Sequence, residues 1–96
     1  MIGRELSPKE IAEVRLNYPP GTRVELIHME DNWAVPSGTR GEVVRTDDAG
    51  QIHMKWDNGR TLAIVPQVDH FRKLTKQELL EEQGTALHQE MSGDMA

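Results

Sequence analysis

The chain has 96 residues, no cysteine and a formal net charge of -5. This length fits one domain with a single modest core, and the lack of cysteine excludes disulfides, thiol nucleophiles and zinc–thiolate sites. The first residues contain no apolar run that resembles a signal peptide, and no stretch approaches the roughly 18 apolar residues of a membrane span. We therefore expect a soluble intracellular protein without membrane contact.

The negative charge is concentrated towards the C-terminal end. Residues 21–74 carry seven basic and eight acidic side chains, whereas residues 75–96 carry one basic and five acidic side chains. Strong nucleic-acid binders need a basic surface, because neutralisation of phosphates drives their affinity. Direct binding of DNA or RNA is therefore disfavoured.

A short helix is predicted over residues 8–17. Ser7 and Glu10 form a capping box around a proline at the first helical position. Pro19 and Pro20 end the helix because neither can continue the backbone hydrogen bonding. The apolar stripe of this helix consists of Ile11, Val14 and Leu16.

From residue 22 onward the pattern changes to five short β-branched runs separated by turn residues. The predicted strands are residues 22–29, 41–46, 51–57, 60–65 and 70–74. In the third run Ile52, Met54 and Trp56 alternate with polar residues, so they should face the core. Asn58-Gly59 predicts a tight hairpin, because both residues tolerate positive φ. A long first loop and a tight turn before the last strand complete the pattern of an SH3-like barrel.

A second helix is predicted in the acidic tail. Thr75 and Glu78 repeat the capping box, and Leu79 and Leu80, with Leu87 further along, form its apolar side. Gly84 interrupts this helix at a cost of about 1 kcal/mol, so we expect fraying beyond it and disorder over residues 91–96. The predicted organisation is a helical extension (1–17), a mainly β five-stranded SH3-like barrel (18–74) and an acidic helical tail (75–96).

Four segments follow a recognisable order along the chain. They are residues 18–26, 36–43, 47–59 and 66–71. Together they resemble a family of small domains of unknown function that occurs in phages and integrative elements of Gram-positive gut bacteria. The resemblance covers residues 18–74 and implies a fold, a mobile genetic setting and the cytoplasm of a bacterial host cell, without catalytic residues. Asn32-Trp33 departs from the family pattern, in which a proline–tyrosine pair is common at this place.

No pattern for catalysis or metal binding stands out. The histidines on separate predicted strands are His28, His53 and His70. A metal site would need them to converge, but single exposed strand histidines are common and no short-spacing pair is present. The aspartates that could act as paired carboxylates are Asp47, Asp48 and Asp57. All three fall at predicted turns, where aspartate hydrogen-bonds the local backbone. We therefore expect no enzyme, no cofactor and no metal.

Trp33 is the first candidate for a partner contact. A tryptophan in a polar loop either folds back onto the barrel or contacts a partner, and the sequence leaves both possibilities open. In SH3-like domains the groove beside the first loop binds extended peptides. Tyr18 and Phe71 would line this groove together with Trp33.

The acidic helix is the second candidate. Its carboxylates Glu78, Glu81 and Glu82 are either a solvated face or a surface that attracts a basic host protein.

Three functions are compatible with these observations. The leading hypothesis is a non-enzymatic, regulatory protein-binding module of a phage or mobile element. Its partner would be a host protein such as an RNA-guided nuclease, which it would inhibit as an anti-CRISPR protein does. The second hypothesis is a nucleic-acid-associated accessory barrel whose contacts are Arg23, Arg40, Arg45, Lys55 and Arg60. The third is a structural or assembly role within the element.

Overall fold

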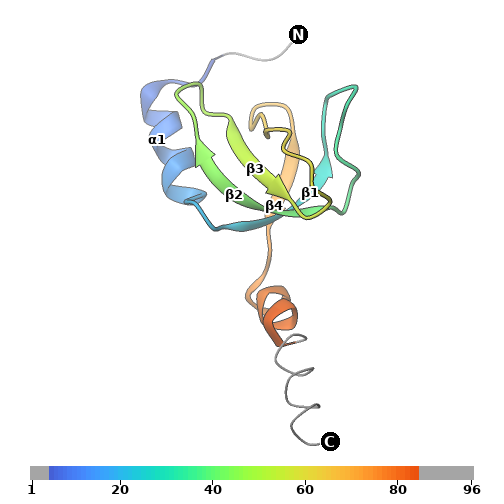
Figure 1. The fold of residues 1–96 in the computed structure, drawn as a ribbon. Helices are drawn as coiled ribbons and strands as arrows, with labels where there is room; N and C mark the ends of the chain where they lie inside the picture. The colour runs from blue at the N-terminus through green and yellow to red at the C-terminus, as the bar shows by residue number, and fades with distance from the viewer. Residues whose placement is uncertain (1–4, 85–96) are drawn as a thin grey trace, which may run out of the picture.

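The computed structural model describes residues 5–84, which form a four-stranded antiparallel sheet accompanied by two helices (Figure 1). The elements are α1 (Pro8–Asn17), β1 (Arg23–His28), β2 (Arg40–Thr46), β3 (Ile52–Trp56), β4 (His70–Lys73) and a C-terminal helix described over residues 76–84. The order in the sheet is β3-β2-β1-β4, so β3 and β4 are its edges. The expected contribution of Leu87 and the expected disorder over 91–96 lie outside the described residues.

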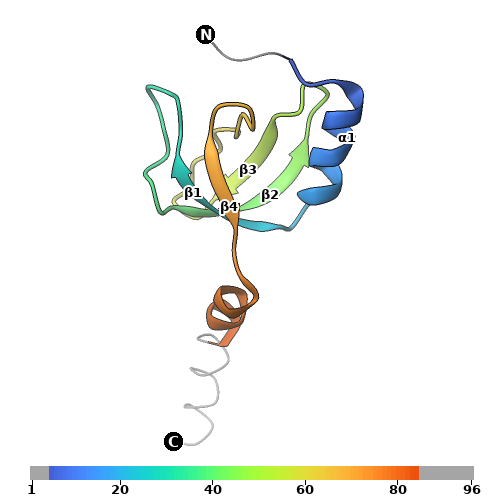
Figure 2. The ribbon, with the colours of Figure 1, turned by 180° about the vertical axis from the view of Figure 1, so that it is seen from behind.

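The first helix has the predicted bounds. Ser7 Oγ accepts a hydrogen bond from the Glu10 backbone (3.2 Å), and Glu10 Oε1 accepts one from the Ser7 backbone (2.9 Å), which confirms the capping box. Figure 2 shows α1 beside β2, where Ile11 is buried and Val14 packs against the core. The predicted stripe is wrong at Leu16, which is 81% exposed. Five residues after Ile11, it points away from the sheet because the helical period is 3.6.

The core lies on one face of the sheet. Its buried strand residues are Val24, Leu26, Val43, Ile52, Met54 and Trp56. The predicted alternation in β3 is therefore confirmed. Gly41 lies opposite Trp56 in the register of β2 and β3, and a Cβ at Gly41 would come within 2.7 Å of the indole. Glycine at this position leaves the room that the tryptophan ring occupies.

The predicted fourth strand is not a strand in the structure. Backbone hydrogen bonds join the segment 60–65 to β3 at two places: Ile64 and Ile52 exchange two of them, and the Trp56 amide donates to the Arg60 carbonyl. Between them, the Leu62 carbonyl accepts from Trp56 Nε1 at 2.8 Å, in place of a backbone donor. A five-stranded closed barrel is accordingly not observed. The hairpin turn is present, although only its Gly59 has positive φ.

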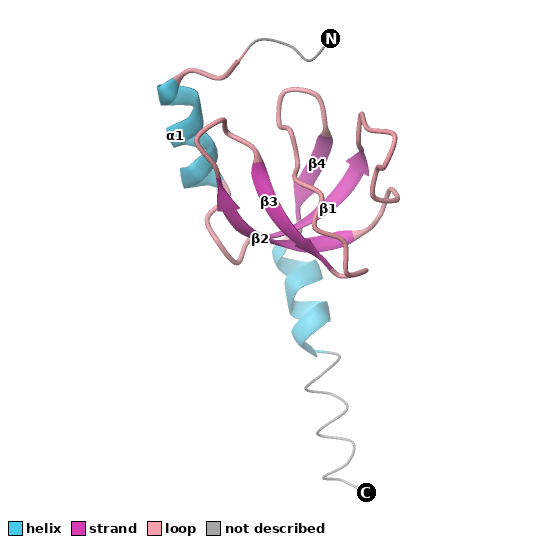
Figure 3. Ribbon diagram, turned by 45° about the horizontal axis from the view of Figure 1, so that its top comes forward, coloured by secondary structure: helices cyan, strands magenta, loops and turns pink. Residues whose placement is uncertain are grey.

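The C-terminal helix begins with the predicted capping box. The Thr75 amide donates to Glu78 Oε1 (2.8 Å) and the Glu78 amide donates to Thr75 Oγ1 (3.1 Å). Buried Leu74 connects β4 to this helix, whereas Leu80 is 52% exposed. Figures 1 and 3 show the helix and the loop after β1 on opposite sides of the sheet. No helix in the described part of the chain is long and apolar enough to cross a bilayer.

Candidate functional site

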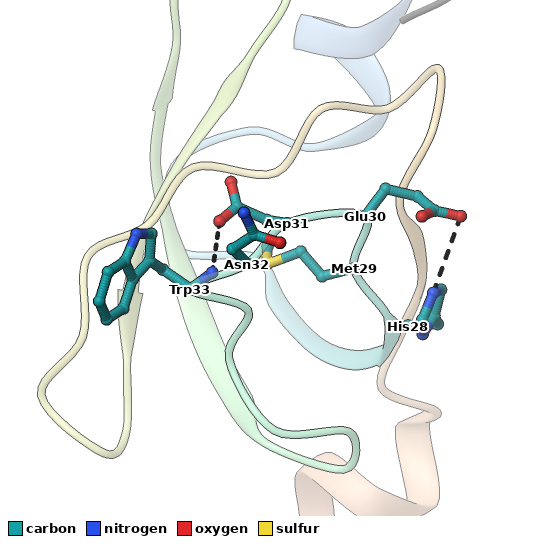
Figure 4. A pocket seen from close by; sticks show the side chains of 6 residues that line it. All are labelled: His28, Met29, Glu30, Asp31, Asn32 and Trp33. Carbon is teal, nitrogen blue, oxygen red and sulfur yellow. Dashed lines mark hydrogen bonds and ion pairs between the residues drawn. The ribbon is translucent and has the colours of Figure 1, made fainter. Parts of the chain in front are cut away.

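The loop after β1 surrounds a shallow, open hollow of about 600 Å³ (Figure 4). The hollow is lined by His28, Met29, Glu30, Asp31, Asn32 and Trp33. We call residues 28–33, which include the last residue of β1, the tryptophan loop. Met29 is only 4% exposed and fixes the loop to the core, whereas Trp33 is 78% exposed. Of the two possibilities that the sequence left open for Trp33, the structure shows the exposed one.

Hydrogen bonds within the loop and from two neighbouring segments hold the tryptophan loop in place. Asp31 Oδ1 accepts from the Trp33 amide at 2.6 Å, and the Arg60 guanidinium donates to the Trp33 carbonyl. Asp69 is buried, and its two carboxylate oxygens accept from the amides of Glu30 (2.9 Å) and Val65 (2.7 Å). Asp69 thus joins the loop to the turn before β4. Sequence reasoning missed this function, and its only signal was an aspartate at the end of a tight turn.

The predicted aromatic lining is not assembled. The rings of Tyr18 and Phe71 lie 5.2 Å apart, and both residues pack half-buried against the core. Lys73 Nζ lies 5.1 Å from the centre of the Tyr18 ring. Trp33 makes no ring contact with Tyr18 or Phe71, although all three residues are in the described part of the chain. Trp33 is therefore the one predicted aromatic that remains available to a partner.

Three arginines lie on the face of the sheet opposite the core. We call Arg23, Arg40 and Arg72 the arginine triad. All three contact the C-terminal helix: both terminal nitrogens of Arg72 lie 2.7 Å from the Glu78 carboxylate, and Arg40 Nη2 lies 3.0 Å from it. Arg23 donates to both oxygens of Glu82, at 3.1 and 2.9 Å. The predicted acidic surface and part of the predicted basic surface therefore neutralise each other.

Two further carboxylates pair with the triad from the sheet side. Arg23 donates to both oxygens of Asp57 at 2.8 and 2.6 Å, while Glu25 lies 3.2 Å from Arg40 and 3.3 Å from Arg72. The strand period of two places these side chains on one face. Alternation in the sequence, combined with the i,i+4 spacing of Glu78 and Glu82, was a signal that could have revealed the network.

The pairing shifts the ionisation of the helix carboxylates. Hydrogen bonds from Arg72, followed by the Thr75 backbone, lower the pKa of Glu78 to about 2. Hydrogen bonds from Arg23 likewise lower the pKa of Glu82 and the pKa of Asp57. These carboxylates are charged at neutral pH. Glu81, the third predicted acidic residue, lies on the exposed side of the helix.

Of the other predicted nucleic-acid residues, Lys55 lines a surface hollow together with Arg23 of the triad. Arg45 and Lys55 are exposed and lie opposite His53 and Glu42, respectively, across β2 and β3. Arg60 is half-buried and holds the Trp33 carbonyl. The five predicted basic residues consequently form no continuous basic surface among the described residues.

The histidines do not converge either. The rings of His28 and His70 lie 6.5 Å apart across β1 and β4, whereas His53 Nε2 lies 2.8 Å from Asp47 Oδ2. Partial burial opposes the charged form of Asp47, but the His53 contact and the Gln51 and Ala49 amides outweigh it and lower its pKa. Within residues 5–84 no three His, Cys, Asp or Glu side chains form a group that could hold a metal ion.

Comparison with protein families matches most of the chain to a described domain. The model of a domain of unknown function, DUF4314, matches residues 7–74. The chain belongs to this family. The matched segment begins at the N-cap of α1 and ends at Leu74, so it contains the tryptophan loop and the arginine triad of this DUF4314 domain. Glu78 and Glu82 follow it in the chain. No curated protein and no solved structure matches significantly.

Proposed function

We propose that this DUF4314 chain is a non-enzymatic protein-binding module and that the tryptophan loop is its contact element. The observation that carries the proposal is the exposure of Trp33, 78%, on a loop held by Arg60 and Asp69 from neighbouring segments. Large aromatic side chains are enriched among the residues that dominate interface energies. A contact that is already ordered also loses less conformational entropy on binding.

The charges around Trp33 favour a basic partner segment. Asp31 is exposed beside it, and Arg60, the basic group joined to the loop backbone among the described residues, is engaged with the Trp33 carbonyl. Glu30 adds a second exposed carboxylate at the far end of the hollow, where it lies 3.8 Å from His28 (Figure 4). An arginine or lysine of the partner would lie over the indole face and pair with the Asp31 carboxylate. A cation over a tryptophan face is stabilised by about 0.5–1 kcal/mol at exposed sites.

The fold proposal is an SH3-like module with an open sheet. Its support is the strand order, in which β4 pairs with β1 and the segment 60–65 bridges β3 at Ile52 and Ile64. A tight turn at 65–69, closed by the Val68 and Asp69 amides on the Val65 carbonyl, precedes the last strand. Such modules commonly bind peptides beside the first long loop.

For the biological setting, we propose a regulatory protein of a phage or mobile element that inhibits a host defence protein such as an RNA-guided nuclease. The support is the resemblance of residues 18–74 to domains of such elements. A captured nuclease would be assayed directly for loss of cleavage in the presence of the chain.

The test is affinity capture from bacterial cytosol followed by binding assays with each purified candidate. Three baits are compared: the unchanged chain, Trp33→Ala, and Leu16→Ala as a matched control, because Leu16 is an equally exposed apolar residue on α1. We expect a partner that binds the unchanged chain and Leu16→Ala and binds Trp33→Ala at least about tenfold more weakly, the loss that a central aromatic contact causes. Equal binding by Trp33→Ala would refute the assignment of the tryptophan loop.

A further inference from the structure

The geometry points to a latent nucleic-acid site. We propose that the arginine triad binds the phosphate backbone of single-stranded nucleic acid, and that the C-terminal helix is an intramolecular cover that occupies the triad with carboxylates. This inference is independent of the tryptophan loop, which lies on the opposite side of the sheet (Figure 1).

The helix occupies the triad in the way an anionic ligand would. Arg72 and Arg23 each present two nitrogens to two oxygens of one glutamate, at distances of 2.7–3.1 Å. The planar guanidinium fork matches a phosphate as well as a carboxylate, which is why arginine is common in phosphate recognition. Glu78 and Glu82 lie one helical turn apart, with Cβ atoms about 5–6 Å from each other. Successive phosphates of a flexible single strand can adopt the same separation as these two carboxylates.

Ion pairs provide most of the contact between helix and sheet. The half-buried side chains of the helix are Glu78, Leu79 and Glu82, and none of its residues belongs to the buried core cluster. Partly exposed ion pairs are individually weak and are screened by salt. Release of the helix would therefore leave the core of the domain intact.

Release of the helix changes the net charge of this face from negative to positive. With the helix docked, the three arginines face four carboxylates, because Glu25 and Asp57 of the sheet join Glu78 and Glu82. Without the helix only Glu25 and Asp57 remain, so the guanidinium groups are in excess. Lys55 and Glu42 lie opposite each other in the adjoining pair of strands, so together they leave this excess of positive charge unchanged. The resulting surface is basic and is formed mainly by arginine.

The experiment compares two full-length variants that each lose two negative charges. Glu78→Gln/Glu82→Gln removes the carboxylates from the triad but keeps the capping box, since glutamine also accepts at this position. Glu13→Gln/Glu81→Gln changes the exposed side chains of α1 and of the C-terminal helix and is the matched control. Binding of a labelled oligothymidylate is followed by fluorescence anisotropy at several salt concentrations, and circular dichroism melting checks that each variant folds.

We expect the Glu78→Gln/Glu82→Gln variant to bind the oligonucleotide about tenfold or more tightly than the unchanged chain and the control. Three phosphate contacts predict that log K falls with log salt at a slope of about -2. Adding Arg72→Gln to this variant should reverse the gain, and Trp33→Ala should not affect it.

Three outcomes would overturn the proposal. The first is no gain for Glu78→Gln/Glu82→Gln, and the second is the same gain in the matched control, which would show a general effect of net charge. The third is equal binding of polyglutamate, which would identify the triad as a site for acidic protein segments. If Trp33→Ala loses a protein partner in any of these cases, the proposed function stands while this inference fails.

Discussion

The two tryptophans provide a sharp test of the fold, because their surroundings differ so strongly. Trp56 is 1% exposed, lies against Gly41 and donates from Nε1 to the Leu62 carbonyl. Trp56→Ala removes a buried aromatic side chain, which costs about 3–5 kcal/mol. The lost hydrogen bond adds about 1 kcal/mol. The sum approaches the whole stability of a small domain, which is about 5–15 kcal/mol.

Trp33→Ala should have a much smaller effect on the free energy of unfolding. With 78% of Trp33 exposed, the substitution forfeits only a minor part of the 1.5–3 kcal/mol that full burial of a large apolar side chain contributes, roughly 0.5 kcal/mol. Urea denaturation followed by circular dichroism measures both values. For a domain of this size, Trp33→Ala should lower Tm by less than about 4 °C. Comparable losses from both substitutions would show that the assigned exposure of Trp33 is wrong.

Three further predictions concern single residues. Gly41→Ala should destabilise by about 1–3 kcal/mol through overpacking, since its Cβ would lie 2.7 Å from Trp56 Cε3; a change below 0.5 kcal/mol in urea denaturation would contradict the contact. Asp69→Ala leaves two amides without their acceptor and should cost more than about 2 kcal/mol, with increased amide hydrogen exchange at Glu30; unchanged exchange would disprove the link. The side-chain carboxyl of Glu78 should titrate by NMR with a pKa of about 2 instead of 4.5. Because its folded-state pKa is lowered, its stabilising contribution is complete above pH 4.5 and is lost as the pH falls towards 2; a pKa near 4.5 would indicate that the helix is not docked.

Local signals in the sequence predicted most elements of the fold. Ser7 and Glu10 determine the start of α1 through contacts within one turn, and the alternation in β3 follows from one buried face. The segment 60–65 has an equally good strand pattern, but it pairs as a strand only at Ile64. The reason is a tertiary contact: the Trp56 indole takes the Leu62 carbonyl that a neighbouring strand would otherwise use. No local pattern encodes that competition between a side chain and a backbone donor.

The candidate sites were harder to predict, because their properties depend on which groups meet in space. The sequence identifies Trp33 as a polar-loop tryptophan, but its exposure depends on Met29 filling the core in its place and on Arg60 holding the loop. The acidic and basic residues were predicted as rival surfaces. Their mutual neutralisation arises because Arg72, in β4, lies only a few residues before Glu78 and next to β1. Net charge along the chain cannot show such pairing.

The edge position of β4 also bears on how the chain avoids self-association. An open sheet leaves backbone donors and acceptors at its margin, and such margins invite strands from other molecules. The other margin, β3, is partly occupied by the bridge between Ile52 and Ile64. At β4 the exposed margin is only four residues long and carries the exposed Lys73, while the register with β1 shifts between Leu26 and His28. Shortness, positive charge and an irregular register each oppose the addition of another strand, so this open sheet should remain soluble at concentrations at which a long apolar edge would polymerise.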